Sequence, residues 1–303
     1  MQNKLKLDLK VLLGCAAVFG SAFCFYLATC VVKWSIMAGL AIEPSFFVFV
    51  RFFIGFLTVV LVMIVKKQPL KPKKYGYLIG RTLANCVAVY CFFKGTALTS
   101  VAQANILNMT YPVFIAVISW FFLKDERDII SIVIVLVSFA GVLLILEPGG
   151  GSGFKLDSMW ALVSGISAAV ALIYLNLCRR ENDTETTLFF LFGLGSIVIF
   201  TIFHNTMYIP DAITLKYLLL CGLFSISGQY LITIGFKYVS AIEGGIISST
   251  RILLAATLGP FIVSDPNLTF FGWIGAFFIF GGNVYLTLRT AKRKIKNPGN
   301  LNS

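Results

Sequence analysis

Four basic residues stand inside otherwise apolar stretches of the sequence, namely Arg51, Arg81, Lys94 and Arg251. A charge at membrane depth is costly, which makes each of these residues a functional candidate. The acidic residues stand at the ends of such stretches, so the deep charge is positive and has no obvious partner. A guanidinium binds carboxylate or phosphate through paired hydrogen bonds. Arg251, near the middle of its stretch, is therefore predicted to bind an anionic group of a solute.

Each basic residue also has a structural interpretation. Arg251 could bond to exposed carbonyl groups of a neighbouring helix or face a water-filled cavity. Arg51 and Arg81 stand nearer the ends of their stretches, where long stems can snorkel to water or cap helix ends. The structural role is favoured for Arg51, the two roles are balanced for Arg81, and Lys94 is expected to reach outward to solvent.

Polar side chains accompany the arginines at helical spacing. Asn85 follows Arg81 by four residues and shares its helix face, as do Asn108 and Tyr111 at a spacing of three. Pro112 follows directly and frees a backbone carbonyl one turn earlier. A helix-to-helix hydrogen bond explains any single one of these residues. Together they predict a polar substrate pocket lined by Arg81, Asn85, Asn108, Tyr111, Gln229, Tyr230 and Arg251.

The elements that carry these residues are expected to be membrane-spanning helices. Apolar runs of about 17 to 24 residues match the roughly 20 that a helix needs to cross hydrocarbon. The runs lie at 11–33, 45–65, 76–97, 102–123, 129–146, 159–178, 187–204, 215–236, 243–264 and 270–289. The links between them are short, so little protein lies outside the bilayer. The sequence predicts an all-α integral membrane protein of ten transmembrane helices in one membrane domain.

Composition and charge agree with this fold class. Of 303 residues, 58% are hydrophobic and 13% are charged, against roughly a quarter charged in soluble domains. The net charge of +12 does not indicate a nucleic-acid partner, because the basic residues gather in alternate loops and in the C-terminal tail. This positive-inside pattern places both termini in the cytoplasm, with the tail on anionic membrane lipids. The expected location is a bacterial inner membrane.

The sequence also contains a weak internal repeat. A shift of 140 residues lays Gly95 on Gly235, Thr110 on Thr250 and Gly141 on Gly281, within spans and links of matching length. Two five-helix halves are predicted, 1–148 and 149–303, joined by a flexible glycine-rich link at 149–153. Because five is odd, the halves enter the membrane from opposite sides. Inverted repeats permit alternating access, although duplication could also simply build a large bundle.

Several short motifs follow one another in a definite order along the chain. They are Phe49-Val50-Arg51-Phe52-Phe53, Arg81, Lys94-Gly95-Thr96-Ala97-Leu98 before Ser100-Val101-Ala102, Thr110-Tyr111-Pro112-Val113-Phe114, the acidic Asp125-Glu126, and Gly141-Val142. In this order and spacing the chain resembles the drug/metabolite transporter superfamily, of EamA-like type, from about 11 to 289. The second half departs from the family pattern at Asp265-Pro266, where Glu commonly stands.

This resemblance implies a transporter but names no cargo, since the family moves amino acids, nucleotide sugars, cofactors such as S-adenosylmethionine, and drugs. We expect a secondary transporter of a small metabolite with an anionic group, such as an amino acid; a nucleotide-derived cofactor is the alternative. A membrane enzyme acting on lipid is less favoured, because such chemistry needs clustered polar groups and His204 stands alone. No catalytic residue, metal or cofactor is predicted. A homodimer could form at Gly281-Gly282.

Overall fold

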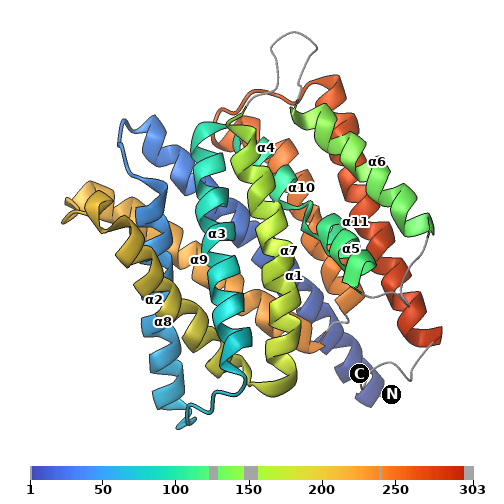
Figure 1. The fold of residues 1–303 in the computed structure, drawn as a ribbon, viewed down its shortest axis with the longest axis horizontal. Coiled ribbons are helices and arrows are strands. Elements are labelled where there is room, and N and C mark those ends of the chain that lie inside the picture. The colour runs from blue at the N-terminus through green and yellow to red at the C-terminus, as the bar shows by residue number, and fades with distance from the viewer. Residues whose placement is uncertain (1, 123–128, 147–155, 239–240, 297–303) are drawn as a thin grey trace.

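The computed structural model describes residues 2–122, 129–146, 156–238 and 241–296, which form a bundle of helices (Figure 1). In chain order the helices are α1 (Gln2–Met37), α2 (Pro44–Val65), α3 (Tyr75–Leu98), α4 (Val101–Asn108), α5 (Tyr111–Phe122), α6 (Ile129–Leu146), α7 (Ser158–Glu181), α8 (Thr184–Phe203), α9 (Ala212–Tyr238), α10 (Ala241–Ile262) and α11 (Phe270–Lys296). A short 3-10 turn, η2 (His204–Thr206), follows α8. The predicted link at 149–153 and the acidic pair Asp125-Glu126 lie outside the described residues.

The helices have the length and composition of membrane spans. Within the described ranges, seven of them are long and apolar enough to cross a membrane, and shorter apolar segments lie at Val133–Ile145, Ile247–Ile262 and Phe270–Leu286. Large apolar side chains such as Leu57 and Leu61 are exposed on the outside of the bundle, as lipid-facing positions require. The predicted all-α membrane fold is confirmed, and the ten predicted spans correspond to these segments.

The fourth predicted span is two helices rather than one. α4 ends at Asn108 and α5 begins at Tyr111, with a short turn between them. Pro112 is the second residue of α5, where its missing N–H and its fixed φ angle suit the start of a helix. The single span predicted over 102–123 is therefore corrected to a broken one, because proline in an uninterrupted helix removes a hydrogen bond and clashes with the preceding turn.

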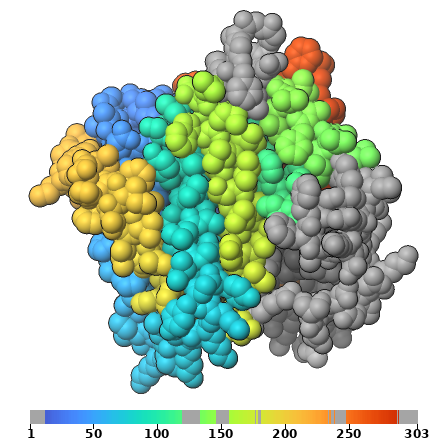
Figure 2. Space-filling view, in the orientation of Figure 1, coloured from blue at the N-terminus to red at the C-terminus, as the bar shows by residue number. Residues whose placement is uncertain are grey.

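The helices pair in a way that repeats between the two halves. α1 packs along α9 and α3 packs along α7, and exchanging the halves turns one pair into the other. α2 packs on α8 and α6 on α11, so each of these pairs joins equivalent helices. Figure 1 shows α3 beside α7 and α6 beside α11, and in Figure 2 α3 and α7 cover one face of the molecule together. The two inverted repeats are thus interleaved, and each main pair crosses from one half to the other.

Glycines at equivalent positions permit two of these close approaches. A Cβ added to Gly95 on α3 would lie 2.9 Å from the backbone nitrogen of Ala161 on α7. A Cβ added to Gly235 on α9 would lie 2.5 Å from Cγ2 of Val18 on α1. Both separations are shorter than packed carbon atoms tolerate, so each interface needs the bare backbone. The repeat seen in the sequence at these two residues has the same structural cause in both halves.

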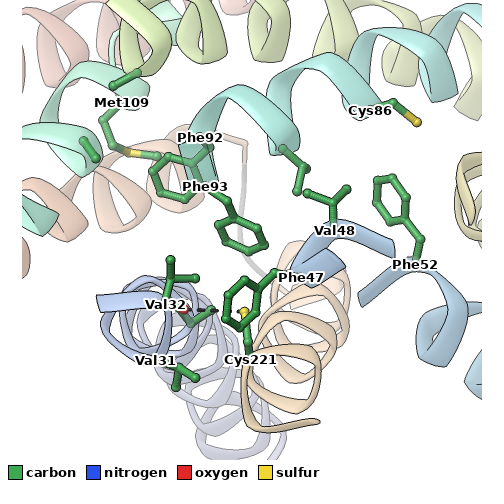
Figure 3. Packing of buried hydrophobic residues seen from close by; sticks show 14 of the residues in the cluster. Val31, Val32, Phe47, Val48, Phe52, Cys86, Phe92, Phe93, Met109 and Cys221 are labelled. Carbon is green, nitrogen blue, oxygen red and sulfur yellow. Dashed lines mark hydrogen bonds between the residues drawn. The ribbon is translucent and has the colours of Figure 1, made fainter. Parts of the chain in front are cut away.

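An apolar layer closes the bundle near the end where α1 and α3 finish and α2 begins. It contains Phe47 of α2, Phe92 and Phe93 of α3, and Val31 and Val32 of α1, which gather around one another in Figure 3. The rings of Phe47 and Phe93 meet edge to face, with centroids 6.3 Å apart. We call these five residues the aromatic layer; Phe47 lies one helical turn from Arg51.

Candidate functional site

Three arginines from three different helices are buried inside the bundle. Arg51 on α2 is 8% exposed, and Arg81 on α3 and Arg251 on α10 are each 6% exposed. Arg51 is the eighth residue of α2 and Arg81 the seventh of α3, and these consecutive helices run in opposite directions. The two residues therefore approach the centre from opposite ends of the bundle. Arg251 stands in the middle of α10, so the positive charge is spread along the bundle axis.

Aromatic rings separate and support the guanidinium groups. Cζ of Arg51 lies 5.6 Å from the ring centroid of Phe25 on α1, and Cζ of Arg251 lies 6.0 Å from the same centroid. Cζ of Arg251 is also 5.4 Å from the ring of Phe92, a member of the aromatic layer. Cations at these distances are attracted to the faces of aromatic rings, which offsets part of their desolvation. Phe25 is thus a shared platform for two positive charges from opposite halves.

The arginines also lie close enough to influence one another. Arg51 interacts electrostatically with both Arg251 and Arg81. These interactions are repulsive, and away from water such repulsion is only weakly screened. The three guanidiniums therefore form one positive site, which we call the arginine site, rather than three separate charges.

Asn108 holds Arg251 at the break between α4 and α5. Oδ1 of Asn108 accepts a short hydrogen bond from Nη2 of Arg251, and Nδ2 of Asn108 donates to Oγ of Ser164 on α7 at 2.7 Å. The bond to Ser164 fixes the direction of the amide, which leaves its oxygen facing the guanidinium. Tyr111, the first residue of α5, also interacts electrostatically with Arg251. Every one of these contacts is made by a neutral group, so the charge of Arg251 stays uncompensated.

No carboxylate pairs with the arginine site among the described residues. The ion pairs found there are Lys66–Glu185 at 2.8 Å and Lys94–Glu43 at 3.9 Å, both near the ends of helices and partly exposed. On α10 itself the acidic residue, Glu243, precedes Arg251 by eight residues, a rise of about 12 Å along a helix. The described protein therefore supplies positive charge at its centre without supplying the counter-charge.

The structure brings together five of the seven predicted site residues. Arg251, Asn108 and Tyr111 meet at the helix break, while Arg81 and Asn85 lie on one face of α3 next to the charge of Arg51. These placements describe the geometry of the site, and the binding role of each residue stays a prediction.

The other two predicted site residues lie on α9. Gln229 is partly buried there. Tyr230 packs on the hydrophobic core and interacts electrostatically with Glu185 near the start of α8. Tyr230 therefore lies toward that end of the bundle rather than at the helix break.

Arg51 is the residue that sequence reasoning underestimated. The expectation that it snorkels to an interface is wrong, because its side chain is buried and faces the ring of Phe25. A signal was present in the sequence: Gly55 lies four residues after Arg51 on the same helix face, and a small residue marks the side of α2 that meets another helix. An added Cβ on Gly55 would lie 2.7 Å from the ring of Phe192 on α8.

Hydrogen bonds tie the helix ends together on the side of the aromatic layer. Nε1 of Trp34 donates to the carbonyl of Ile262 at 2.9 Å, and Nζ of Lys33 donates to the carbonyl of Thr99 at 2.8 Å. The N–H of Ala102 donates to Oδ2 of Asp265 at 3.1 Å. The bonds of Trp34 and Lys33 tie the end of α1 to the end of α10 and to the link after α3, and the bond of Asp265 ties α4 to the link after α10.

Two interleaved inverted repeats of membrane helices with a buried charged centre are the architecture of a membrane transporter. The profile of the EamA-like transporter family matches residues 12–147 and again 156–288. The chain belongs to this family, and each match covers one five-helix half.

Several characterised proteins are similar to the chain over much of its length. The pseudopaline exporter CntI of Pseudomonas aeruginosa is 25% identical over 222 residues, which cover 73% of this chain and 77% of the exporter. Solute carrier family 35 member G1 of Mus musculus is 24% identical over 91% of this chain and 76% of its own length. A riboflavin transporter of Rhizobium johnstonii is 24% identical over 72% of each chain. A solved crystal structure shares the fold over 92% of this chain and 99% of its own, with a TM-score of 0.59 at 18% identity.

Proposed function

We propose that this protein is a secondary transporter that moves a small metabolite bearing an anionic group across the membrane by alternating access. An amino acid or a related organic acid is the favoured cargo. The proposed location is a bacterial inner membrane, with both termini in the cytoplasm, as the distribution of basic residues favours.

The observation that carries the proposal is the unpaired positive charge of the arginine site. A single charge at the centre of a membrane helix costs roughly 2.5–3.5 kcal/mol on insertion scales. Arg251 is buried in the middle of its helix and Arg51 and Arg81 are buried nearer the beginnings of theirs, and none of the three has a carboxylate partner among the described residues. A bound anion offsets this cost through charge-assisted hydrogen bonds, which are the strong ones in proteins. A site for a neutral or cationic cargo has no use for this arrangement.

The arginine site is built from residues of both halves, and this supports alternating access. Arg51 and Arg81 belong to the first repeat and Arg251 to the second, and the bond between Arg251 and Asn108 joins the repeats directly. A solute held by arginines of both repeats contacts both halves, so its arrival and departure can be coupled to movement of one half against the other. The bonds of Trp34 and Lys33 hold the end of α1 against both halves at one end of the bundle.

A nucleotide-derived cofactor such as S-adenosylmethionine is the second candidate. Aromatic rings lie beside the arginines, since Phe25 and Phe92 both face Arg251, and flat aromatic groups stack on flat bases. Transport of the large ring system of riboflavin by a relative of 24% identity is consistent with a roomy site in this family. Among the described residues no carboxylate lies at the arginine site to meet the positive centre of S-adenosylmethionine, which makes this cargo the weaker choice.

Arg251→Ala in proteoliposomes tests the proposal. Loss of a charged hydrogen bond costs about 1.5–3 kcal/mol, so uptake of the cargo, found by screening labelled metabolites, should fall about 10- to 100-fold. Arg251→Lys keeps the charge and should retain more of the activity, and Lys94→Ala, in a partly exposed ion pair, should transport normally. Uptake by Arg251→Ala at the unaltered rate, with the protein folded, would refute the proposed role of this residue.

A further inference from the structure

Four buried nitrogen atoms at and beside the arginine site lack hydrogen-bond partners, and each of the four is a donor. Nε of Arg51, Nε of Arg81, Nε of Arg251 and Nδ2 of Asn85 are each buried without a hydrogen-bond partner. A guanidinium and an amide nitrogen can only donate. Buried donors are normally satisfied, and those left over are costly. The ligand that completes this site must therefore bring several acceptor oxygens.

The positions of these donors divide them into two groups. Arg51 and Arg251 face the same ring, that of Phe25, from α2 and α10. Arg81 and Asn85 are four residues apart on α3, where they share a face. Arg81 stands near the beginning of α3, and Arg51 near the beginning of the antiparallel α2, so the two groups are offset along the bundle axis. One anionic group cannot reach both sets of donors with good geometry.

The balance of charge also favours two anionic groups in the ligand. A single negative charge leaves two of the three guanidiniums uncompensated, and Arg51 would still repel a neighbour on at least one side. In a site shielded from water this repulsion remains strong. A second negative group removes it, because the remaining net charge is then no greater than that of one arginine, which Asn108 and the aromatic rings already support.

We propose that the transported solute carries at least two anionic groups on a short skeleton, as in a dicarboxylate or a phosphorylated carboxylate. One group binds between Arg51 and Arg251 at Phe25, and the other binds toward Arg81 and Asn85. Arg51 and Arg81 are then the residues that distinguish a dianion from a monoanion. This inference rests on the proposed function, since it specifies the cargo of that same site.

Matched ligands that differ by one acidic group test the inference on the full-length protein in detergent and in proteoliposomes. Thermal stabilisation and uptake are measured for succinate against butyrate, glutamate against glutamine, and 3-phosphonopropionate against propionate. The more anionic member of at least one pair should act at a concentration at least tenfold lower than its partner. A response to the phosphonate alone identifies phosphate as the second group, and a response to the dicarboxylates identifies carboxylate.

Variants then assign the preference to the proposed residues. Arg51→Gln and Arg81→Gln should each weaken the response to the dianion by more than the response to the monoanion, so that the tenfold preference for the dianion is lost. Arg51→Lys restores a positive charge and should recover part of the preference, which distinguishes charge recognition from a packing defect. Lys94→Gln is the matched control outside the site and should keep the full preference.

Two different failures have different meanings. Equal responses to both members of every pair, with a response that still depends on Arg251, overturn the dianion and leave the proposed transport of an anionic solute in place. No response to any acid, together with uptake of neutral metabolites, overturns both. A dianion preference that survives both Arg51→Gln and Arg81→Gln removes these residues from the inference.

Discussion

Helices α3 and α9 are equivalent in the repeat and have the same packing role, but they carry different chemistry. Each uses a glycine to approach a helix of the other half, Gly95 in α3 and Gly235 in α9. At the same shift of 140 residues, Arg81 of α3 corresponds to Cys221 of α9. Cys221 is buried and donates its thiol hydrogen to the carbonyl of Ala28 on α1, so that position serves packing rather than charge.

A second pair of equivalent residues shows the same contrast. Tyr111 and Arg251 correspond in the repeat, and they interact with one another across the interface of the halves. The backbone and the small residues are alike in the two halves, whereas the charged groups differ between them. The duplicated features thus lie in the packing of the helices. In the transport that we propose, the charged groups need to be placed only once, because there is one solute to hold.

The largest effect on transport should come from Asn108→Asp, which changes the charge beside Arg251. The new carboxylate stands where the amide oxygen meets Arg251 and supplies from within the protein the charge that we assign to the solute. Transport should fall about 10- to 100-fold, by the cost of a lost charged interaction, while the melting temperature in detergent should rise. Ser164→Ala removes the other bond of Asn108 without adding charge and should cost far less transport. Normal transport by Asn108→Asp would contradict an anion site beside Arg251.

An intermediate effect, on stability, should come from valine at the equivalent glycines. Gly95→Val and Gly235→Val each force a side chain into a backbone contact, and overpacking of this kind costs about 1–3 kcal/mol. The two variants should lower the melting temperature by similar amounts, because the two interfaces are equivalent. Gly281→Ala is the control, since an added Cβ there meets nothing within 4 Å. If only one of the two variants left the melting temperature unchanged, the two interfaces would not be equivalent.

The smallest effect concerns Asp265, in the link between α10 and α11. Burial raises the pKa of its carboxyl above the ordinary 3.8, although the N–H of Ala102 and the charge of Lys33 oppose the rise. The folded state thus holds this proton more tightly than the unfolded state, so the contribution to stability is greatest below pH 3.8 and is lost as the pH rises through the raised pKa. Asp265→Asn should flatten this dependence, with a shift in melting temperature of about 1–3 °C. If Asp265→Asn leaves the pH dependence of the melting temperature unchanged, another group causes that dependence.

Sequence reasoning predicted the spans and the inverted repeat because both rest on local properties. Hydrocarbon imposes a fixed length on an apolar helix, and an odd number of spans per half fixes the relative orientation of the halves. Arg251 was predicted for a similar reason, since a residue in the middle of a membrane helix is too far from either helix end to reach water. These arguments need no knowledge of which helices touch.

The remaining features depend on contacts between helices, which the sequence does not contain. Arg51 is close enough to a helix end to snorkel, and only its packing against Phe25 shows that it turns inward. Tyr230 has the polarity expected of a site residue but faces toward Glu185. The break after Asn108 was signalled by Pro112, but a proline indicates either a kink or a new helix start. The sequence does not show that the carbonyl of Met109 in this break accepts a hydrogen bond from a residue 174 positions away.

The first repeat contains a helix break, between α4 and α5, that the second repeat lacks. The carbonyl of Met109, in the turn between α4 and α5, accepts a hydrogen bond from Nδ2 of Asn283 on α11 at 2.8 Å. The equivalent stretch of α10 runs unbroken, with Ile252 where the first repeat has Pro112. The break lets α4 and α5 change their relative angle, whereas α10 is one continuous helix with Pro260 near its end. In the transport cycle that we propose, opening toward one side of the membrane and opening toward the other should therefore be different movements with different barriers.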